Sequence, residues 1–171
     1  MKKIFAGLVL LLISVNISFD IITVGLFPDF AGCILIVRGL SEIEDSVIYP
    51  KLKVFFSVLI GYTALLYAMD MFGISSALPD GLNIVLALIS LLCVIVGTYF
   101  LSRGVAELER NRERRFGASR LMMCWLILAV CKIAAYGLFL INLFWITGIT
   151  AGIIGAIFYL SAFYRMTRIY T

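Results

Sequence analysis

The stretch FPDFAGCILIVRGLSE, residues 27–42, raises the main question about the fold. A Pro-Asp pair opens it, apolar and small residues follow, and Arg38 then ends the apolar run. A helix needs about twenty apolar residues to cross a membrane. Most of the chain supplies apolar runs of that length, so residues 27–42 predict one short helix among longer ones.

The composition places the chain in a membrane. It has 171 residues, of which 63% are hydrophobic and 14% are charged, and its mean hydropathy is +1.11. Soluble domains are about half apolar and about a quarter charged. No polar linker divides the chain, so residues 1–171 predict a single all-α transmembrane domain.

The residue types exclude several kinds of chemistry. The chain contains no histidine, which removes histidine ligands, catalytic triads and histidine proton shuttles. None of the cysteines forms a CxxC pair, so neither a disulfide framework nor a zinc site is predicted. These four cysteines are Cys33, Cys93, Cys124 and Cys131. We therefore expect no metal and no cofactor.

Six helices are predicted from the apolar runs. Their ranges are Ile4–Phe27, Asp29–Val47, Val54–Phe72, Leu82–Leu101 with a possible continuation beyond it, and two helices within Leu121–Tyr164 that turn near Asn142–Gly148. The start MKKIFAGLVLLLIS resembles a signal peptide. No small-x-small cleavage site closes its apolar core, which continues to Phe27, so a retained first helix is predicted.

The basic residues predict the orientation. Twelve of the fourteen Lys and Arg residues lie in alternate gaps between the predicted helices, and gaps 26–29, 73–81 and 141–148 contain none. Positive residues stay on the cytoplasmic side. We expect both termini in the cytoplasm and the chain in a bacterial inner membrane.

Two segments of the chain resemble each other. RGLSEIE at residues 38–44 matches RGVAELE at 103–109, and Pro-Asp pairs occur at 28–29 and 79–80. The pattern predicts a six-helix bundle of three parallel helical hairpins, a known transporter plan. The repeat units are approximately residues 1–48, 51–113 and 115–171, with the third diverged and the second helix short.

The Pro-Asp pairs predict helix starts. Proline is tolerated at a helix start, and an aspartate there favours the positive helix end and can accept orphan N–H bonds. We predict that Asp29 and Asp80 begin helices at the outer turns. The alternative is a cation site at the outer mouth.

Arg38 allows two interpretations. It aligns with Arg103, and each precedes a glutamate by four residues, Glu42 or Glu107, which suits a helix-surface ion pair at the inner interface. Alternatively, Arg38 lies deep in the membrane and meets Asp20 of the neighbouring helix.

Three further charges fall inside predicted helices. Asp20, Asp70 and Lys132 each follow a basic residue by seventeen positions, which predicts that they lie in the outer half of the membrane. Charges there are costly and usually paired. With Arg38 they form a neutral candidate cluster. It is either a structural plug or a site for a substrate or proton, unless Asp20 or Asp70 reaches outer water.

A charged loop at residues 107–120 joins the second and third hairpins. Its arginines include Arg110, Arg112, Arg114 and Arg115. We expect them to set the topology and to contact anionic lipid head groups. Nucleic-acid binding is not expected, because no aromatic residues interleave with the arginines.

Small residues recur on the last predicted helix. Gly148, Gly152 and Ala156 are spaced by four, which lets helices approach closely. Packing within the monomer is favoured over a dimer interface.

Two resemblances accompany these patterns. The segment Phe27–Gly32, followed by Arg38-Gly39-Leu40, resembles a Pro-Asp-Phe-Ile-Gly-type motif of small bacterial membrane proteins without known activity. In size and helix number the chain is also similar to the substrate-binding S components of energy-coupling-factor transporters, which implies a partner subunit. Lipoprotein signal peptidases match in size, but their motifs are absent.

The expected function is that of a small solute or ion transporter, or of its substrate-binding membrane subunit. A non-catalytic scaffold is the alternative, with a homo-oligomer or another partner possible in either case. An intramembrane hydrolase using Asp20 and Asp70 is less favoured, so enzymatic activity is not the expectation.

Overall fold

The computed structural model describes residues 1–13, 16–19, 22–25, 28–43, 48–112, 117–140 and 145–170. These residues form seven helices and a two-stranded sheet. The elements in chain order are α1 (Lys2–Leu12), β1 (Asn16–Phe19), β2 (Ile22–Gly25), α2 (Asp29–Leu40), α3 (Ile48–Met71), α4 (Ile74–Ala77), α5 (Asp80–Asn111), α6 (Ala118–Leu140) and α7 (Trp145–Tyr170).

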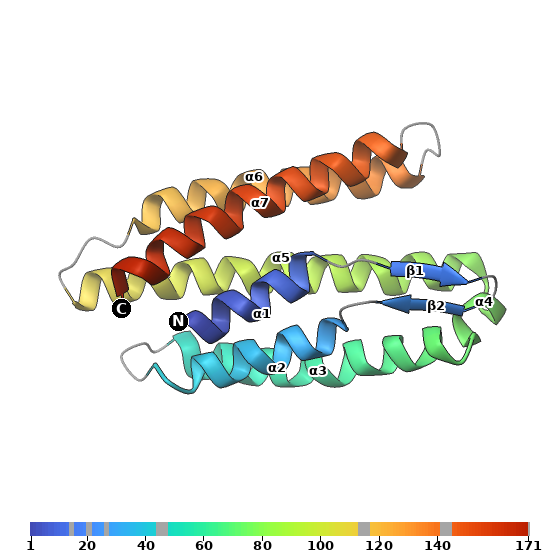
Figure 1. Cartoon of the computed structure of the whole chain (residues 1–171), viewed down its shortest axis with the longest axis horizontal. Coiled ribbons are helices and arrows are strands. Elements are labelled where there is room, and N and C mark those ends of the chain that lie inside the picture. The colour runs from blue at the N-terminus through green and yellow to red at the C-terminus, as the bar shows by residue number, and fades with distance from the viewer. Residues whose placement is uncertain are drawn as a thin grey trace.

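The chain runs back and forth along the long axis of the molecule (Figure 1). The long helices α3, α5, α6 and α7 each make one pass, while α4 lies at the far end. In the first hairpin, α1 and α2 lie in the half nearer the termini and the β-hairpin lies in the other half. Both termini therefore lie at the same end of the molecule.

The first hairpin differs from the predicted pair of membrane helices. The helix predicted at Ile4–Phe27 is wrong, because α1 ends at Leu12 and β1 pairs antiparallel with β2. Residues 16–25 contain Ile17, Phe19 and the β-branched run 21–24, and β-branched and aromatic residues favour a strand over a helix. Hydropathy alone does not distinguish the two.

The predicted second helix, Asp29–Val47, was also too long. Helix α2 ends at Leu40, and residues 44–47 lie outside the described residues. At about 1.5 Å per residue, α2 extends about 18 Å, roughly half the thickness of a bilayer with its head groups. The start of α2 is therefore placed inside the bundle rather than at its outer end (Figure 1).

The later helices agree better with the prediction. Helix α5 does continue into the charged segment, and α7 begins at Trp145, so the predicted turn at 142–148 ends earlier than expected. Within the described residues, three helices are long and apolar enough to cross a membrane: Ile48–Met71, Gly81–Asn111 and Ala118–Gly137.

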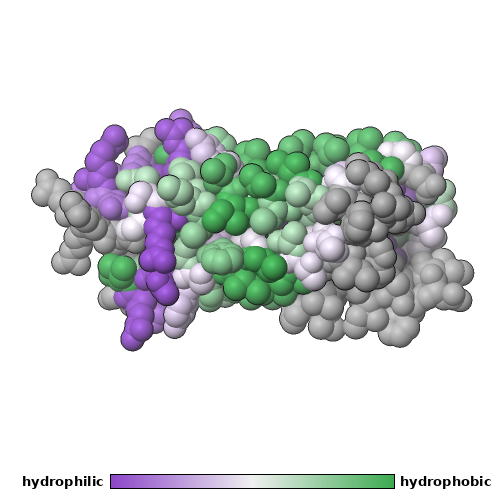
Figure 2. Space-filling view, turned by 90° about the horizontal axis from the view of Figure 1, so that it is seen from above, coloured by the Kyte–Doolittle hydropathy of each residue, from purple (hydrophilic) through white to green (hydrophobic). Residues whose placement is uncertain are grey.

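These helices expose apolar side chains on the surface of the molecule. Val58 is 70% exposed and Met123 is 70% exposed, although both are apolar. Figure 2 shows a hydrophobic band beside one end where hydrophilic residues gather. That end carries the termini and every described Lys and Arg except Lys132. An apolar band of this kind is the surface expected to contact lipid.

Glycines bring α1 and α2 into backbone contact. A Cβ added at Gly7 would lie 2.5 Å from the carbonyl oxygen of Gly32, and one at Gly39 would lie 2.8 Å from the amide nitrogen of Ile4. Only glycine permits this approach, so the two short helices form one tightly packed pair.

Helices α6 and α7 pack in the same way. A Cβ at Gly148 would lie 2.9 Å from the carbonyl oxygen of Ala135, and one at Gly155 would lie 2.9 Å from Cβ of Cys131. Gly152 also lies beside Ala135. Packing of this small-residue stripe within the monomer is therefore confirmed.

Candidate functional site

Asp29 and Lys132 form the charged centre of the described structure. Asp29 is the first residue of α2, and Lys132 lies within α6. Each is half-buried, and the two charges interact electrostatically across the gap between the helices without a direct ion pair. Since α2 begins inside the bundle, the two charges meet away from its ends.

The Asp29 carboxylate is incompletely bonded. Its Oδ1 atom is buried and has no hydrogen-bond partner among the described residues. The preceding Pro28 is the N-cap of α2 and supplies no side-chain hydrogen bond. A buried acceptor without a donor costs about 1–3 kcal/mol, and more when it is charged. This oxygen is therefore free to take a proton or to coordinate a small cation.

The Cys33 thiol of α2 lies between Asp29 and polar side chains of two neighbouring helices. The Cys33 thiol, one helical turn along α2, lies beside Asp29, Thr63 of α3 and Cys93 of α5. The Thr63 hydroxyl donates to the carbonyl oxygen of Leu59 at 2.8 Å. The polar cluster therefore draws on α2, α3, α5 and, through Lys132, α6.

Electrostatics explains why Asp29 and Lys132 belong together. A charge inside an apolar bundle is costly, and an opposite charge nearby reduces that cost. The N-terminus of α2 adds a partial positive charge at Asp29. The arrangement places a carboxyl group near an amine inside the bundle, where either group can exchange a proton.

Asp70 does not join this centre. It lies at the end of α3, where the Ser75 hydroxyl donates to its Oδ1 atom. The Asn83 side chain in turn donates to the carbonyl oxygen of Ser75 at 2.9 Å. Asp70 thus belongs to the connection around α4 at the far end of the bundle.

The equal spacing from basic residues predicted that Asp70 and Lys132 lie at the same level of the bundle, and this prediction is wrong. Helix α3 begins at Ile48, before Lys53, whereas α6 begins at Ala118, after Arg115. Asp70 therefore lies about 33 Å along its helix and Lys132 about 21 Å along its own, at about 1.5 Å per residue. A spacing of seventeen residues from a basic side chain therefore does not place two residues at the same level, because the helices begin at different positions relative to those basic residues.

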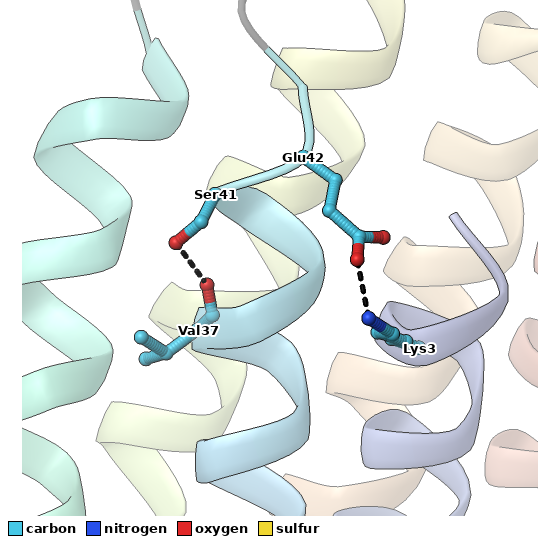
Figure 3. A network of polar contacts seen from close by, with 4 residues as sticks. All are labelled: Lys3, Val37, Ser41 and Glu42. Atoms are coloured by element: carbon cyan, nitrogen blue, oxygen red, sulfur yellow. Dashed lines mark hydrogen bonds and ion pairs between the residues drawn. The ribbon is translucent and has the colours of Figure 1, made fainter.

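Arg38 is exposed near the basic end of the molecule rather than buried within the bundle. It is exposed in the last turn of α2, where a cation complements the negative end of the helix. The predicted pairing of Arg38 with Glu42 is replaced by an ion pair between Glu42 and Lys3 of α1 (Figure 3). The hydrogen bond from Lys3 lowers the pKa of the Glu42 carboxyl from its ordinary value.

The two matching segments make matching contacts. Glu42 bonds to the start of α1, and Glu107 accepts a hydrogen bond at 3.3 Å from the backbone of Ile48 at the start of α3. Gly39 packs on α1, and a Cβ at Gly104 would clash with the Tyr49 ring of α3. Each segment therefore contacts the start of an earlier helix, Glu42 through a side-chain ion pair and Glu107 through a backbone hydrogen bond.

The other candidate residues are peripheral or lie outside the described part. Helix α5 begins at Asp80, as predicted for that residue. Arg110 and Arg112 are exposed beyond the apolar part of α5. Asp20, Arg114 and Arg115 lie outside the described residues.

The sequence contained a signal for Asp29 that the outer-turn prediction missed. If Arg38 marks the interface, Asp29 must lie about 13 Å deeper, because nine helical residues separate them. An aspartate at that depth requires a counter-charge, and Lys132 is the described basic residue that provides it.

No family model, curated protein sequence or solved structure matches this chain.

Proposed function

We propose that the chain is a polytopic membrane transporter for a proton or small cation, and that Asp29 is its binding group. The observation that carries this proposal is the buried, unpartnered Oδ1 atom of Asp29 opposite Lys132. A buried ion pair stabilises a fold only when additional hydrogen bonds satisfy the remaining lone pairs of its carboxylate. Here one oxygen is left for a transported ion.

The short helix α2 supports this proposal. Transporters commonly place ion and substrate sites where a helix is interrupted near the middle of the membrane. Non-helical backbone at that depth is tolerated where it is buried in protein or lines a water-filled cavity. Asp29 stands at such an interruption, with the β-hairpin on one side and α2 on the other.

The ends of the molecule support the membrane orientation. We place the basic end, with both termini, on the cytoplasmic side of a bacterial inner membrane. In a variant without native cysteines, an impermeant thiol reagent applied to intact cells should label a cysteine at Ser76 and spare one at Ser119. Both positions are exposed. Labelling at 119 but not at 76 would reverse the orientation.

Ion flux in proteoliposomes tests the function. Wild-type protein should carry H⁺, Na⁺ or K⁺ down an imposed gradient faster than empty vesicles, as measured with entrapped ion-sensitive dyes. Asp29→Asn keeps the shape of the side chain and removes its charge, so it should reduce that flux at least tenfold. Asp70→Asn is the matched control and should leave the flux within a factor of two.

The contrary outcome favours the scaffold alternative. Close glycine contacts in α1–α2 and α6–α7 are compatible with a packed bundle whose charges only hold helices together. Wild-type vesicles without flux, or undiminished flux in Asp29→Asn, would overturn the transport proposal. In that case Asp29 and Lys132 form a structural plug.

A further inference from the structure

A pocket opens between the start of α1 and the end of α7, at the basic end of the bundle. Its volume is about 310 Å³, and it is lined by Lys2, Phe5, Tyr164, Thr167 and Arg168. This volume lies at the lower end of the range for small-molecule sites.

Two cations at this pocket lack an acidic partner among the described residues. Lys2 and Arg168 are both exposed, and neither takes part in a described ion pair. The described acids at this end are engaged elsewhere: Glu42 pairs with Lys3, Glu107 accepts from Ile48, and Glu109 accepts from Ala118 at 2.8 Å. The pocket therefore presents positive charge that the described protein does not neutralise.

The backbone adds to this positive charge. Helix α1 begins at Lys2 and carries no acidic residue in its first turn. The N–H groups of a first helical turn have no partner within the helix and favour an anion. An anion beside Lys2 would therefore meet both a side-chain cation and the positive end of α1.

The other lining residues are two aromatic side chains and Thr167. The Phe5 and Tyr164 rings contact each other with centroids 5.4 Å apart. Tyr164 is 55% exposed. Figure 2 shows that the hydrophilic end borders the hydrophobic band directly. The basic residues suit the charged head group of a phospholipid, and the adjoining apolar surface suits its tails.

We propose that the α1–α7 pocket binds the phosphate head group of an anionic phospholipid through Lys2 and Arg168. This inference rests on the membrane location proposed above and not on transport. Arg168 provides planar donors that suit phosphate oxygens, and Lys2 provides a second charge. The lipid tails then lie against Phe5 and Tyr164, which are about one helical turn further from the basic end than Lys2 and Arg168.

Native mass spectrometry of the full chain in detergent tests this site. Titration with short-chain phosphatidylglycerol should give a saturable first binding event. Each basic residue contributes about 1 kcal/mol near an anionic lipid surface, so Lys2→Gln with Arg168→Gln should weaken this event by about tenfold or more. Lys51→Gln with Arg120→Gln removes the same charge from exposed positions outside the pocket and should weaken it less than threefold.

Two other probes separate the possible sources of phosphate. Short-chain phosphatidylcholine, which is zwitterionic, should bind more weakly than phosphatidylglycerol. Inorganic phosphate at the same concentration should not compete appreciably, because it lacks the tails. Equal loss in both charge variants, equal binding of the two lipids, or full competition by phosphate would each overturn the proposed lipid site. None of these results depends on ion flux.

Discussion

Replacing Lys132 by methionine should lower the free energy of unfolding by about 3–5 kcal/mol. The change keeps the length of the side chain but leaves Asp29 as a buried charge without its counter-charge, and a broken buried pair typically costs this much. Adding Asp29→Asn removes the remaining charge and should restore most of the loss. Thermal unfolding in detergent, followed for both single variants and the double variant, measures the coupling between the two residues.

An exposed lysine provides the control for this cycle. Lys51→Met removes a charge at the basic end, where water screens it, and should change stability by at most about 0.5 kcal/mol. If Lys132→Met were as stable as the wild type, the two charges would have to face water. Failure of Asp29→Asn to rescue it would show that Lys132 acts through another contact.

Gly7→Ala should be destabilising by about 1–3 kcal/mol, the usual range for an overpacked interface. The added Cβ would lie 2.5 Å from the Gly32 carbonyl oxygen and 2.9 Å from the Ile36 amide nitrogen. Both contacts are backbone atoms, so no side chain can rotate away and α1 must separate from α2. Thermal unfolding in detergent measures the loss.

Gly61→Ala is the matched control, because the same change is made in the middle of a helix. A Cβ at Gly61 meets nothing within 4 Å. Alanine there should be neutral or stabilising by up to about 1 kcal/mol, through its higher helix propensity. Similar effects of the two substitutions would mean that α1 and α2 are not in backbone contact.

The long helices were predictable because their apolar runs and charged borders are unambiguous. Helices α3, α5 and α6 match apolar segments with basic residues near one end, and the glycine stripe of α7 correctly indicated packing within the chain. These features depend on local sequence alone. Hydropathy and residue size are sufficient to recognise them.

The first hairpin and the charged centre were not predictable in the same way. Residues 16–25 continue the apolar run of α1 with only a few polar residues, and the choice of strands depends on β-branching and on pairing between β1 and β2. The partner of Lys132 depends on where α2 begins relative to α6. Spacing along one helix cannot provide that relation between helices, so Asp70 was favoured over Asp29.

The glycine contacts also divide the bundle into two closely packed helix pairs. Backbone contact at Gly7 and Gly32 joins α1 to α2, while Gly148 and Gly155 bring α7 against α6. Asp29 belongs to the α1–α2 pair and Lys132 to the α6–α7 pair. The attraction between them varies inversely with their separation and weakens further where water enters. A change in the angle between the two helix pairs therefore changes the separation of Asp29 and Lys132. The charge state of Asp29 and the arrangement of the helix pairs are coupled in this way.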